Sequence, residues 1–213
     1  MKKNIFILLG IFYFSNLLRS QTFEGEYVYH VDFPANSELS TDYTIVSNGQ
    51  KFKTLWSMQG RKIEMIALDG NQNLMIMPDQ KMAMKTSSNN PMMNKGAGPI
   101  QKDMQCTPQP GSGTKNIAGH SCKEYISKCT DKQGKTSTIT FYHTTEISMP
   151  KTYESLAESS QQGLPKSGGA ILEMSMETEG KVVMKMTVKG ITPRKVLASE
   201  FEVPAGFQII DNP

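Results

Sequence analysis

Apolar and polar side chains alternate along most of this chain, and that two-residue period constrains the fold more than any other feature. In FEGEYVYHVDF, residues 23–33, aromatic and aliphatic side chains hold most odd positions and mainly polar ones hold the even positions. Successive side chains of a strand point to opposite faces of a sheet, so the pattern predicts strands with one buried face. Turn residues separate about ten such segments, which predicts a mainly β fold of antiparallel strands.

Two segments depart from the alternation. Residues 86–115 are rich in Ser, Asn, Pro and Gly and show no period, which predicts a flexible loop that serves as a lid or an insert. After Pro150, the side chains of Tyr153, Leu156 and Ala157 have helical spacing, which predicts one short amphipathic helix.

The first 20 residues are typical of a secretory signal peptide, with two lysines, an apolar run over 5–14 and a polar exit. We expect cleavage near Ser20, a single β-rich domain over 21–213, and a periplasmic or secreted protein. The apolar run is shorter than the roughly 20 residues of a membrane-spanning helix, so we expect no spanning segment. Of the 23 basic residues three lie in this segment, which leaves 20 against 20 acidic ones. A neutral chain lacks the positive charge that binds nucleic acid.

The three cysteines of an exported chain allow one internal disulfide and leave one thiol. Cys122 and Cys129 lie seven residues apart on one predicted strand and point to opposite faces, so Cys106 must be the partner of one of them. We expect Cys122 to be buried on the face of Ile139 and Phe141, and Cys129 to point outward. An outward thiol needs a partner in an oxidising compartment, which favours Cys106 with Cys129 over the alternative, Cys106 with Cys122.

A first hairpin places two large aromatic side chains on one apolar face. Asn48 and Gly49 predict a two-residue type I′ turn, which sets Ile45 opposite Phe52. Phe52 and Trp56 then point to the same side of the sheet as Ile45. We take both aromatic residues as candidate ligand contacts.

Methionines recur at alternate positions on both sides of two tight turns, in residues 74–85 and 173–186. If PDQK, residues 78–81, is the first turn, Met77 lies opposite Met82 and the four thioethers share one face. Methionine is unbranched and flexible, so these side chains either fill an irregular core or line an adaptable cavity for apolar chains. The methionines concerned are Met75, Met77, Met82, Met84, Met174, Met176, Met184 and Met186.

A soft metal site is the alternative use of sulfur in this sequence, since thioethers and thiolates select Cu(I). With a turn at 131–134, Cys122 falls opposite His143, and His120 lies two residues away on the same face. Against this reading, residues two apart in a strand are roughly 6.6 Å from each other, which suits chelation of one ion poorly.

The sequence contains none of the common catalytic signatures. A Gly-x-Ser-x-Gly elbow, a His-Glu-x-x-His helix and a P-loop are all missing from the printed chain. Cys122 and His143 lack an acid partner and an oxyanion donor that could be named. We expect no enzymatic activity and no cofactor.

Four short segments carry a resemblance to known families: 114–125 (TKNIAGHSCKEY), 141–150 (FYHTTEISMP), 163–174 (GLPKSGGAILEM) and 201–211 (FEVPAGFQIID). Together they resemble uncharacterised exported bacterial families of unknown function with LolA-like half-barrels. The chain is more distantly similar to the GLPGLI family, from whose signature Lys166 departs. The resemblance implies an antiparallel sheet curled around an apolar hollow, with a helical lid, as in carriers of lipoprotein acyl chains.

The sequence therefore predicts a mainly β (α+β) open antiparallel half-barrel of about ten strands with one short helix. The expected function is non-catalytic binding of an apolar or acyl-bearing ligand in a methionine-lined cavity in the cell envelope. The expected partner is a hydrophobic small molecule, a lipid or an acylated protein. The two alternatives are a copper-binding periplasmic protein using Met, His and Cys, and a structural envelope protein whose core is full.

Overall fold

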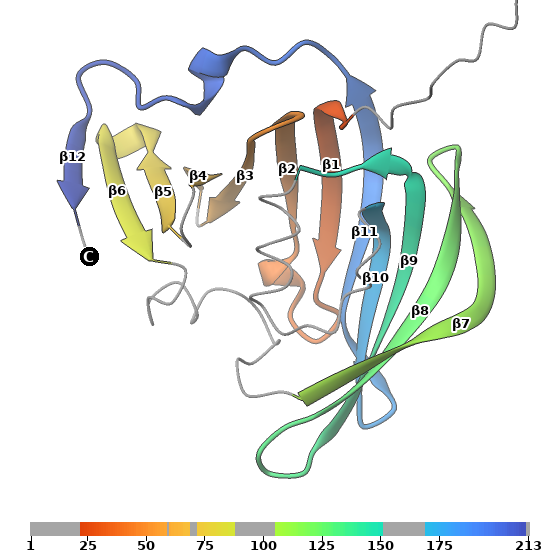
Figure 1. Ribbon diagram of the computed structural model, residues 1–213. Helices are drawn as coiled ribbons and strands as arrows, with labels where there is room; N and C mark the ends of the chain where they lie inside the picture. The colour runs from red at the N-terminus through yellow and green to blue at the C-terminus, as the bar shows by residue number, and fades with distance from the viewer. Residues whose placement is uncertain (1–21, 59, 69–71, 88–104, 151–168, 212–213) are drawn as a thin grey trace, which may run out of the picture.

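The computed structural model describes residues 22–58, 60–68, 72–87, 105–150 and 169–211. They form one open sheet in the order β12-β6-β5-β4-β3-β2-β1-β11-β10-β9-β8-β7 (Figure 1). Neighbouring strands are antiparallel, except that β12 is parallel to β6. The strands are β1 (Glu24–Asp32), β2 (Thr41–Asn48), β3 (Phe52–Met58), β4 (Arg61–Ala67), β5 (Gln72–Met77), β6 (Met82–Ser87), β7 (Gln105–Ile117), β8 (His120–Thr130), β9 (Thr136–Ser148), β10 (Gly169–Thr178), β11 (Lys181–Pro193) and β12 (Gln208–Asp211).

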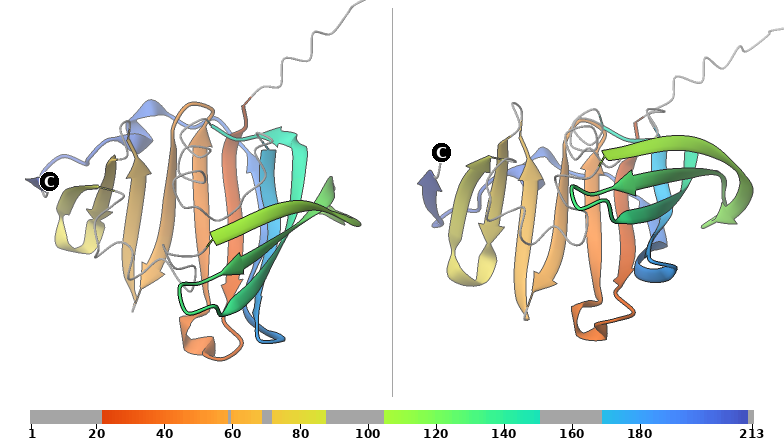
Figure 2. Two further views of the ribbon diagram at one scale, coloured as in Figure 1. Left: turned by 60° about the horizontal axis from the view of Figure 1, so that its bottom comes forward. Right: turned by 90° about the horizontal axis from the view of Figure 1, so that it is seen from below.

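The sheet is strongly twisted, and β7 and β8 sweep round at one end of it (Figure 2). This is the open, mainly β architecture predicted from the alternation, with twelve strands where about ten were expected. Helical structure in the described residues is limited to the short 3₁₀ segments η1 (Ser37–Leu39), η2 (Pro78–Gln80) and η3 (Ala198–Phe201). The helix predicted around Tyr153–Ala157 lies outside the described residues.

The loop predicted over 86–115 is wrong at both ends. Thr86 and Ser87 complete β6, and 105–115 form most of β7. Because β7 pairs only with β8 and is an edge strand, it tolerates Pro108 and Pro110, which remove backbone donors. The segment with these prolines lacks the alternation of apolar and polar residues, so the sequence did not predict this strand. Residues 88–104 lie outside the described part of the chain.

The β2–β3 turn lies one residue later than predicted, which shifts the pairing of the two strands by two residues. Asn48 N donates to Lys51 O at 3.2 Å, and Gly49 has a φ of 83°. Gly49 and Gln50 therefore form the turn, and Ser47 rather than Ile45 lies opposite Phe52. A shift of two residues leaves every side chain on its predicted face, because the side-chain period of a strand is also two.

The β8–β9 hairpin differs by one residue, and that difference exchanges the faces. Asp131 Oδ1 accepts from the backbone N–H groups of Gln133 and Lys135, at 2.9 and 2.8 Å, and closes a five-residue loop instead of a four-residue one. Lys123, not Cys122, consequently lies opposite His143. The predicted opposition of Cys122 and His143 is wrong.

One face of the sheet, called here the inner face, carries the larger apolar core. It is bridged by side chains that reach over an intervening strand. Tyr29 Oη on β1 donates to the Ile171 carbonyl on β10 at 2.8 Å, across β11. Tyr43 Oη on β2 donates to the Met186 sulfur on β11 at 2.8 Å, across β1. The sheet thus curls toward this face.

The outer face of β2–β6 has a second core, formed with the C-terminal segment, residues 194–207. This segment crosses the sheet after β11 and ends in β12, beside β6 (Figure 1). Arg194 anchors its start through Glu26 Oε1 at 2.7 Å and Glu200 Oε2 at 2.8 Å. The buried residues of this core are Val46, Ile66, Leu74, Ile76, Ala83, Val196 and Phe201.

We expect Phe201→Ala to lower the free energy of unfolding by about 3 kcal/mol, the lower end for such a deletion in a core. Phe201 is 5% exposed and packs in the outer core, whereas Leu197, earlier in the same segment, is 57% exposed. Leu197→Ala is therefore the matched control and should change stability by no more than about 0.5 kcal/mol. Urea denaturation measures both. Equal losses would contradict the placement of the segment.

Candidate functional site

Both methionine hairpins have the cross-strand pairing predicted for the first of them. Met75 lies opposite Met84 and Met77 opposite Met82 on β5 and β6. On β10 and β11 the corresponding pairs are Met174 with Met186 and Met176 with Met184. Directly opposite residues share a face, so each hairpin presents four thioethers on one side of the sheet.

The pairing register places the first hairpin on the inner face. Ile45, which belongs to the inner core, lies opposite Thr54. Thr54 lies opposite Met65, Met65 opposite Met75, and Met75 opposite Met84. This line crosses β2 to β6 and includes Met65, which the sequence analysis missed. The alternation of KIEMIA, residues 62–67, carries that signal, because it gives Ile63 and Met65 the same face.

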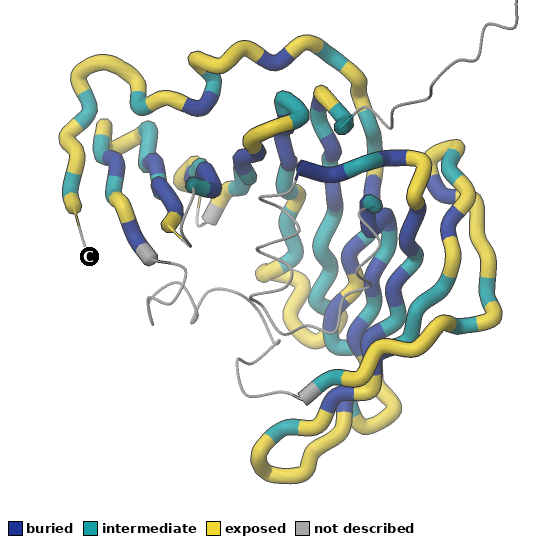
Figure 3. Tube along the Cα trace, viewed as in Figure 1, coloured by how far each residue is buried: buried dark blue, intermediate teal, exposed yellow. Residues whose placement is uncertain are grey.

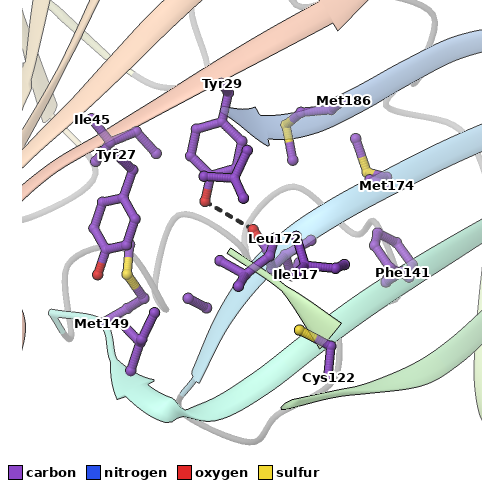
Figure 4. Close-up of a cluster of buried hydrophobic side chains, with 14 of the residues drawn as sticks. Tyr27, Tyr29, Ile45, Ile117, Cys122, Phe141, Met149, Leu172, Met174 and Met186 are labelled. Atoms are coloured by element: carbon purple, nitrogen blue, oxygen red, sulfur yellow. Dashed lines mark hydrogen bonds between the residues drawn. The ribbon is translucent and has the colours of Figure 1, made fainter. Parts of the chain in front are cut away.

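The second hairpin belongs to the same face but is packed into the core. Met186 lies opposite Val31 on β1 and Met174 lies opposite Phe141 on β9. Figure 4 shows Met174 and Met186 among Phe141, Tyr29 and other inner-core side chains. We call Met174, Met176, Met184 and Met186 the buried methionine cluster; their exposed fractions are 3–8%.

The methionines of the first hairpin are only partly buried. The aliphatic side chains that alternate with them, Leu74, Ile76 and Ala83, are buried in the outer core. Buried and partly buried residues accordingly alternate along β5 and β6 (Figure 3). Trp56 is also partly exposed, whereas Phe52 is buried in the inner core. We call Met65, Met75, Met77, Met82 and Met84 the half-buried methionine cluster.

The inner face therefore carries two methionine groups of different character. The buried cluster is part of the inner core. The half-buried cluster, four strands away along the sheet, presents apolar and polarisable surface together with Trp56. The structure places all eight predicted methionines on one face and divides them into these two groups.

The candidate copper ligands do not form the predicted group. His120 Nδ1 lies 3.0 Å from Glu146 Oε2, beside a cleft of about 270 Å³ that Phe23 and Ile191 also line. His143 is buried, and its ring is edge-on to Tyr125 with 5.9 Å between centroids. Among the described residues, no three His, Cys, Asp or Glu side chains are grouped so that they could hold a metal ion.

Burial sets the protonation of His143 and Cys122. It lowers the pKa of the His143 imidazole, against a smaller upward effect of a hydrogen bond with the Gly169 backbone. It raises the pKa of the Cys122 thiol, and the negative charge of Glu146 adds to the rise. Both groups are therefore held in their neutral forms. A neutral thiol is a poor nucleophile and a poor metal ligand.

The disulfide joins Cys106 on β7 to Cys129 on β8 and leaves Cys122 as the free cysteine. This is the pairing favoured from the sequence, but the reason given for it was wrong. Cys129 is 1% exposed and does not point outward. The one-residue shift of the β8–β9 pairing puts Tyr125 and Ser127, rather than Glu124 and Ile126, opposite Phe141 and Ile139. Cys122 is buried, as predicted, in the same inner core as those two residues.

Comparison with known proteins gives one family. The model of a family described as Domain of unknown function (DUF4412) matches residues 23–207, most of the chain. The comparison with curated proteins gives no match. Within the described residues, no helix has the length and apolar character needed to cross a membrane.

We expect acid to destabilise the protein partly through His143. Its pKa in the folded state is lowered, whereas the unfolded chain titrates near about 6.5. As the pH falls below that value, the unfolded state binds the proton more readily, so the free energy of unfolding decreases. Urea denaturation from about pH 7 to about pH 5 should show a smaller decrease in His143→Gln than in the wild type. Identical pH dependence in both proteins would contradict this.

We expect Cys122 to resist alkylation in the folded protein. Its thiol is buried and its pKa is raised, so iodoacetamide at mildly alkaline pH should leave it unmodified until the chain unfolds. Mass spectrometry should then find the label on Cys122 and a linked pair of Cys106 and Cys129. Labelling of Cys122 in the native protein, or a link to Cys122, would contradict the structure.

Proposed function

This chain belongs to that family of unknown function, and we propose that it binds an extended apolar ligand, such as an acyl chain, on the inner face of β3–β6. One observation carries the proposal. The half-buried methionine cluster and Trp56 are partly exposed on the inner face, although the same strands bury the side chains of their other face in the outer core. Exposed apolar side chains gathered in one place are typical of a binding surface.

The cluster has the dimensions of a chain-binding surface. Neighbouring strands are about 4.8 Å apart, so β3 to β6 span about 14 Å. Each methylene removed from water contributes about 0.8 kcal/mol. A chain of about ten methylenes, half buried on this surface, would gain on the order of 4 kcal/mol before ordering costs. Flexible methionine side chains adapt to such a ligand without a fixed pocket.

The proposal places the protein in the cell envelope as a non-catalytic carrier. The signal-like residues 1–20, the expected cleavage near Ser20 and the resemblance to LolA-like half-barrels all support it. The Cys106–Cys129 disulfide supports an oxidising compartment. The partner would then be a lipid or an acylated protein.

Cu(I) binding by thioethers is the second candidate, and the cross-strand geometry favours it more than the sequence did. Met75 and Met84 lie directly opposite each other, as do Met77 and Met82. Opposite residues of antiparallel strands have Cβ atoms about 4.5–5.5 Å apart, closer than residues two apart on one strand. This would be a site of methionines alone, because His120, Cys122 and His143 do not join it.

A fluorescent fatty acid titrated into the protein tests the proposal. The double variant Met75→Asp/Met84→Asp puts two charges on the surface and should weaken binding by roughly tenfold or more. Replacing the five methionines of the half-buried cluster by leucine keeps the apolar area and should change the affinity by less than about threefold. Val182→Asp is the matched control, because Val182 is 45% exposed on β11 and already faces water.

The same variants separate the two candidates. If the surface binds Cu(I), the five-leucine variant loses the metal, because the thioether sulfurs are gone. A wild-type protein that binds Cu(I) but no fatty acid would overturn the proposal in favour of copper. A wild-type protein that binds neither would leave the half-buried cluster as a structural surface.

A further inference from the structure

The two methionine clusters lie on one face of one sheet but differ in their access to solvent. The side chains of the buried cluster are 3–8% exposed and pack among aromatic residues. The sulfur of Met186 also accepts a hydrogen bond from Tyr43 at 2.8 Å. The five methionines of the half-buried cluster are partly open to solvent. A reagent that attacks thioether sulfur therefore meets an accessible group and a protected group in the same molecule.

We propose that the half-buried methionine cluster is an oxidation site, at which peroxide converts thioethers to sulfoxides and thereby switches off the ligand surface. The oxidation itself follows from the geometry alone, and its effect on the ligand rests on the proposed function. Nothing in the ordinary packing of the sheet requires five partly exposed methionines, since leucine would fill the same positions.

The chemistry needs only hydrogen peroxide and the thioether. The sulfur attacks one peroxide oxygen, the O–O bond breaks, and a sulfur–oxygen bond forms. The sulfur loses two electrons, and the second oxygen leaves as water with both protons. The product is a polar sulfoxide in place of an apolar side chain.

The arrangement of β5 and β6 lets this happen without loss of the fold. Leu74, Ile76 and Ala83 hold these strands through the outer core, on the side away from the methionines. A sulfoxide on the inner face is solvated in place because its position is already partly exposed. The side chains of the buried cluster have almost no contact with solvent, so their oxidation requires local opening of the core and is slow.

The cross-strand pairs make the surface sensitive to a single event. Met75 and Met84 are opposite each other, and Met65 is opposite Met75 on the other side. One sulfoxide in this line puts a polar oxygen between two apolar neighbours. An acyl chain lying across it then loses contact on three adjacent strands.

Trypsin separates the two clusters cleanly, so the site can be tested by peptide mass spectrometry after graded peroxide treatment. Peptides 63–81 and 82–85 contain the half-buried cluster. Peptides 167–181, 182–185 and 186–189 contain the buried cluster. We expect the first group to gain oxygen at least about tenfold faster in the folded protein and at similar rates after denaturation. Equal rates in the folded protein would overturn the proposal.

The effect on the ligand is tested with the fluorescent fatty acid and the five-leucine variant. Peroxide should weaken binding by roughly tenfold in the wild type and leave the five-leucine variant unchanged, with the same thermal unfolding temperature before and after treatment. Loss of binding in both proteins would place the sensitive group elsewhere and overturn the switch. If untreated protein binds no fatty acid while oxidation is still selective, the proposed function fails and the oxidation site stands without a ligand role.

Discussion

The curl of the sheet depends on side chains that bridge over a strand on the inner face. A twelve-stranded sheet with two free edges in its described part must bury an apolar face by bending toward it. The hydroxyl of Tyr29 reaches the Ile171 carbonyl across β11, and the hydroxyl of Tyr43 reaches Met186 across β1. These contacts satisfy polar groups within an otherwise apolar core. They also bring β1, β2, β10 and β11 around a common centre, which the buried methionine cluster helps to fill.

The other half of the sheet buries its aliphatic side chains on the outer face instead. Strands β2 to β6 bury their aliphatic side chains under the C-terminal segment, which Arg194 ties to Glu26 and Glu200. The carboxylate of Glu200 has its pKa lowered to about 2, first because of the hydrogen bond from Arg194. Because burial in the outer core already stabilises these strands, their stability does not require that the side chains of their inner face are also buried. The methionines and Trp56 can therefore remain partly exposed to solvent on that face.

The alternation in the sequence predicted the strands and most of their faces, while the turns decided the rest. The pairing of β2 with β3 shifted by two residues and kept Phe52 and Trp56 on the expected face. The pairing of β8 with β9 shifted by one residue, because Asp131 closes a longer loop. Cys129 therefore lies in the inner core, where Cys122 also lies. Strand β7 escaped notice because an edge strand needs neither regular alternation nor a full set of backbone donors. Burial on the outer face depends on where the C-terminal segment crosses the sheet, and the local sequence pattern of the strands does not indicate that position.

The eight methionines therefore fall into a buried group and a half-buried group, which composition alone could not distinguish. In β10 and β11 the thioethers fill a core, a role that leucine would serve nearly as well. In β5 and β6 they face away from the core that stabilises their strands, so packing does not explain them. What distinguishes methionine from leucine at such positions is flexibility and sulfur chemistry. A functional role for methionine in this chain is thus to be sought on β4–β6, where Met65 extends the line across a third strand.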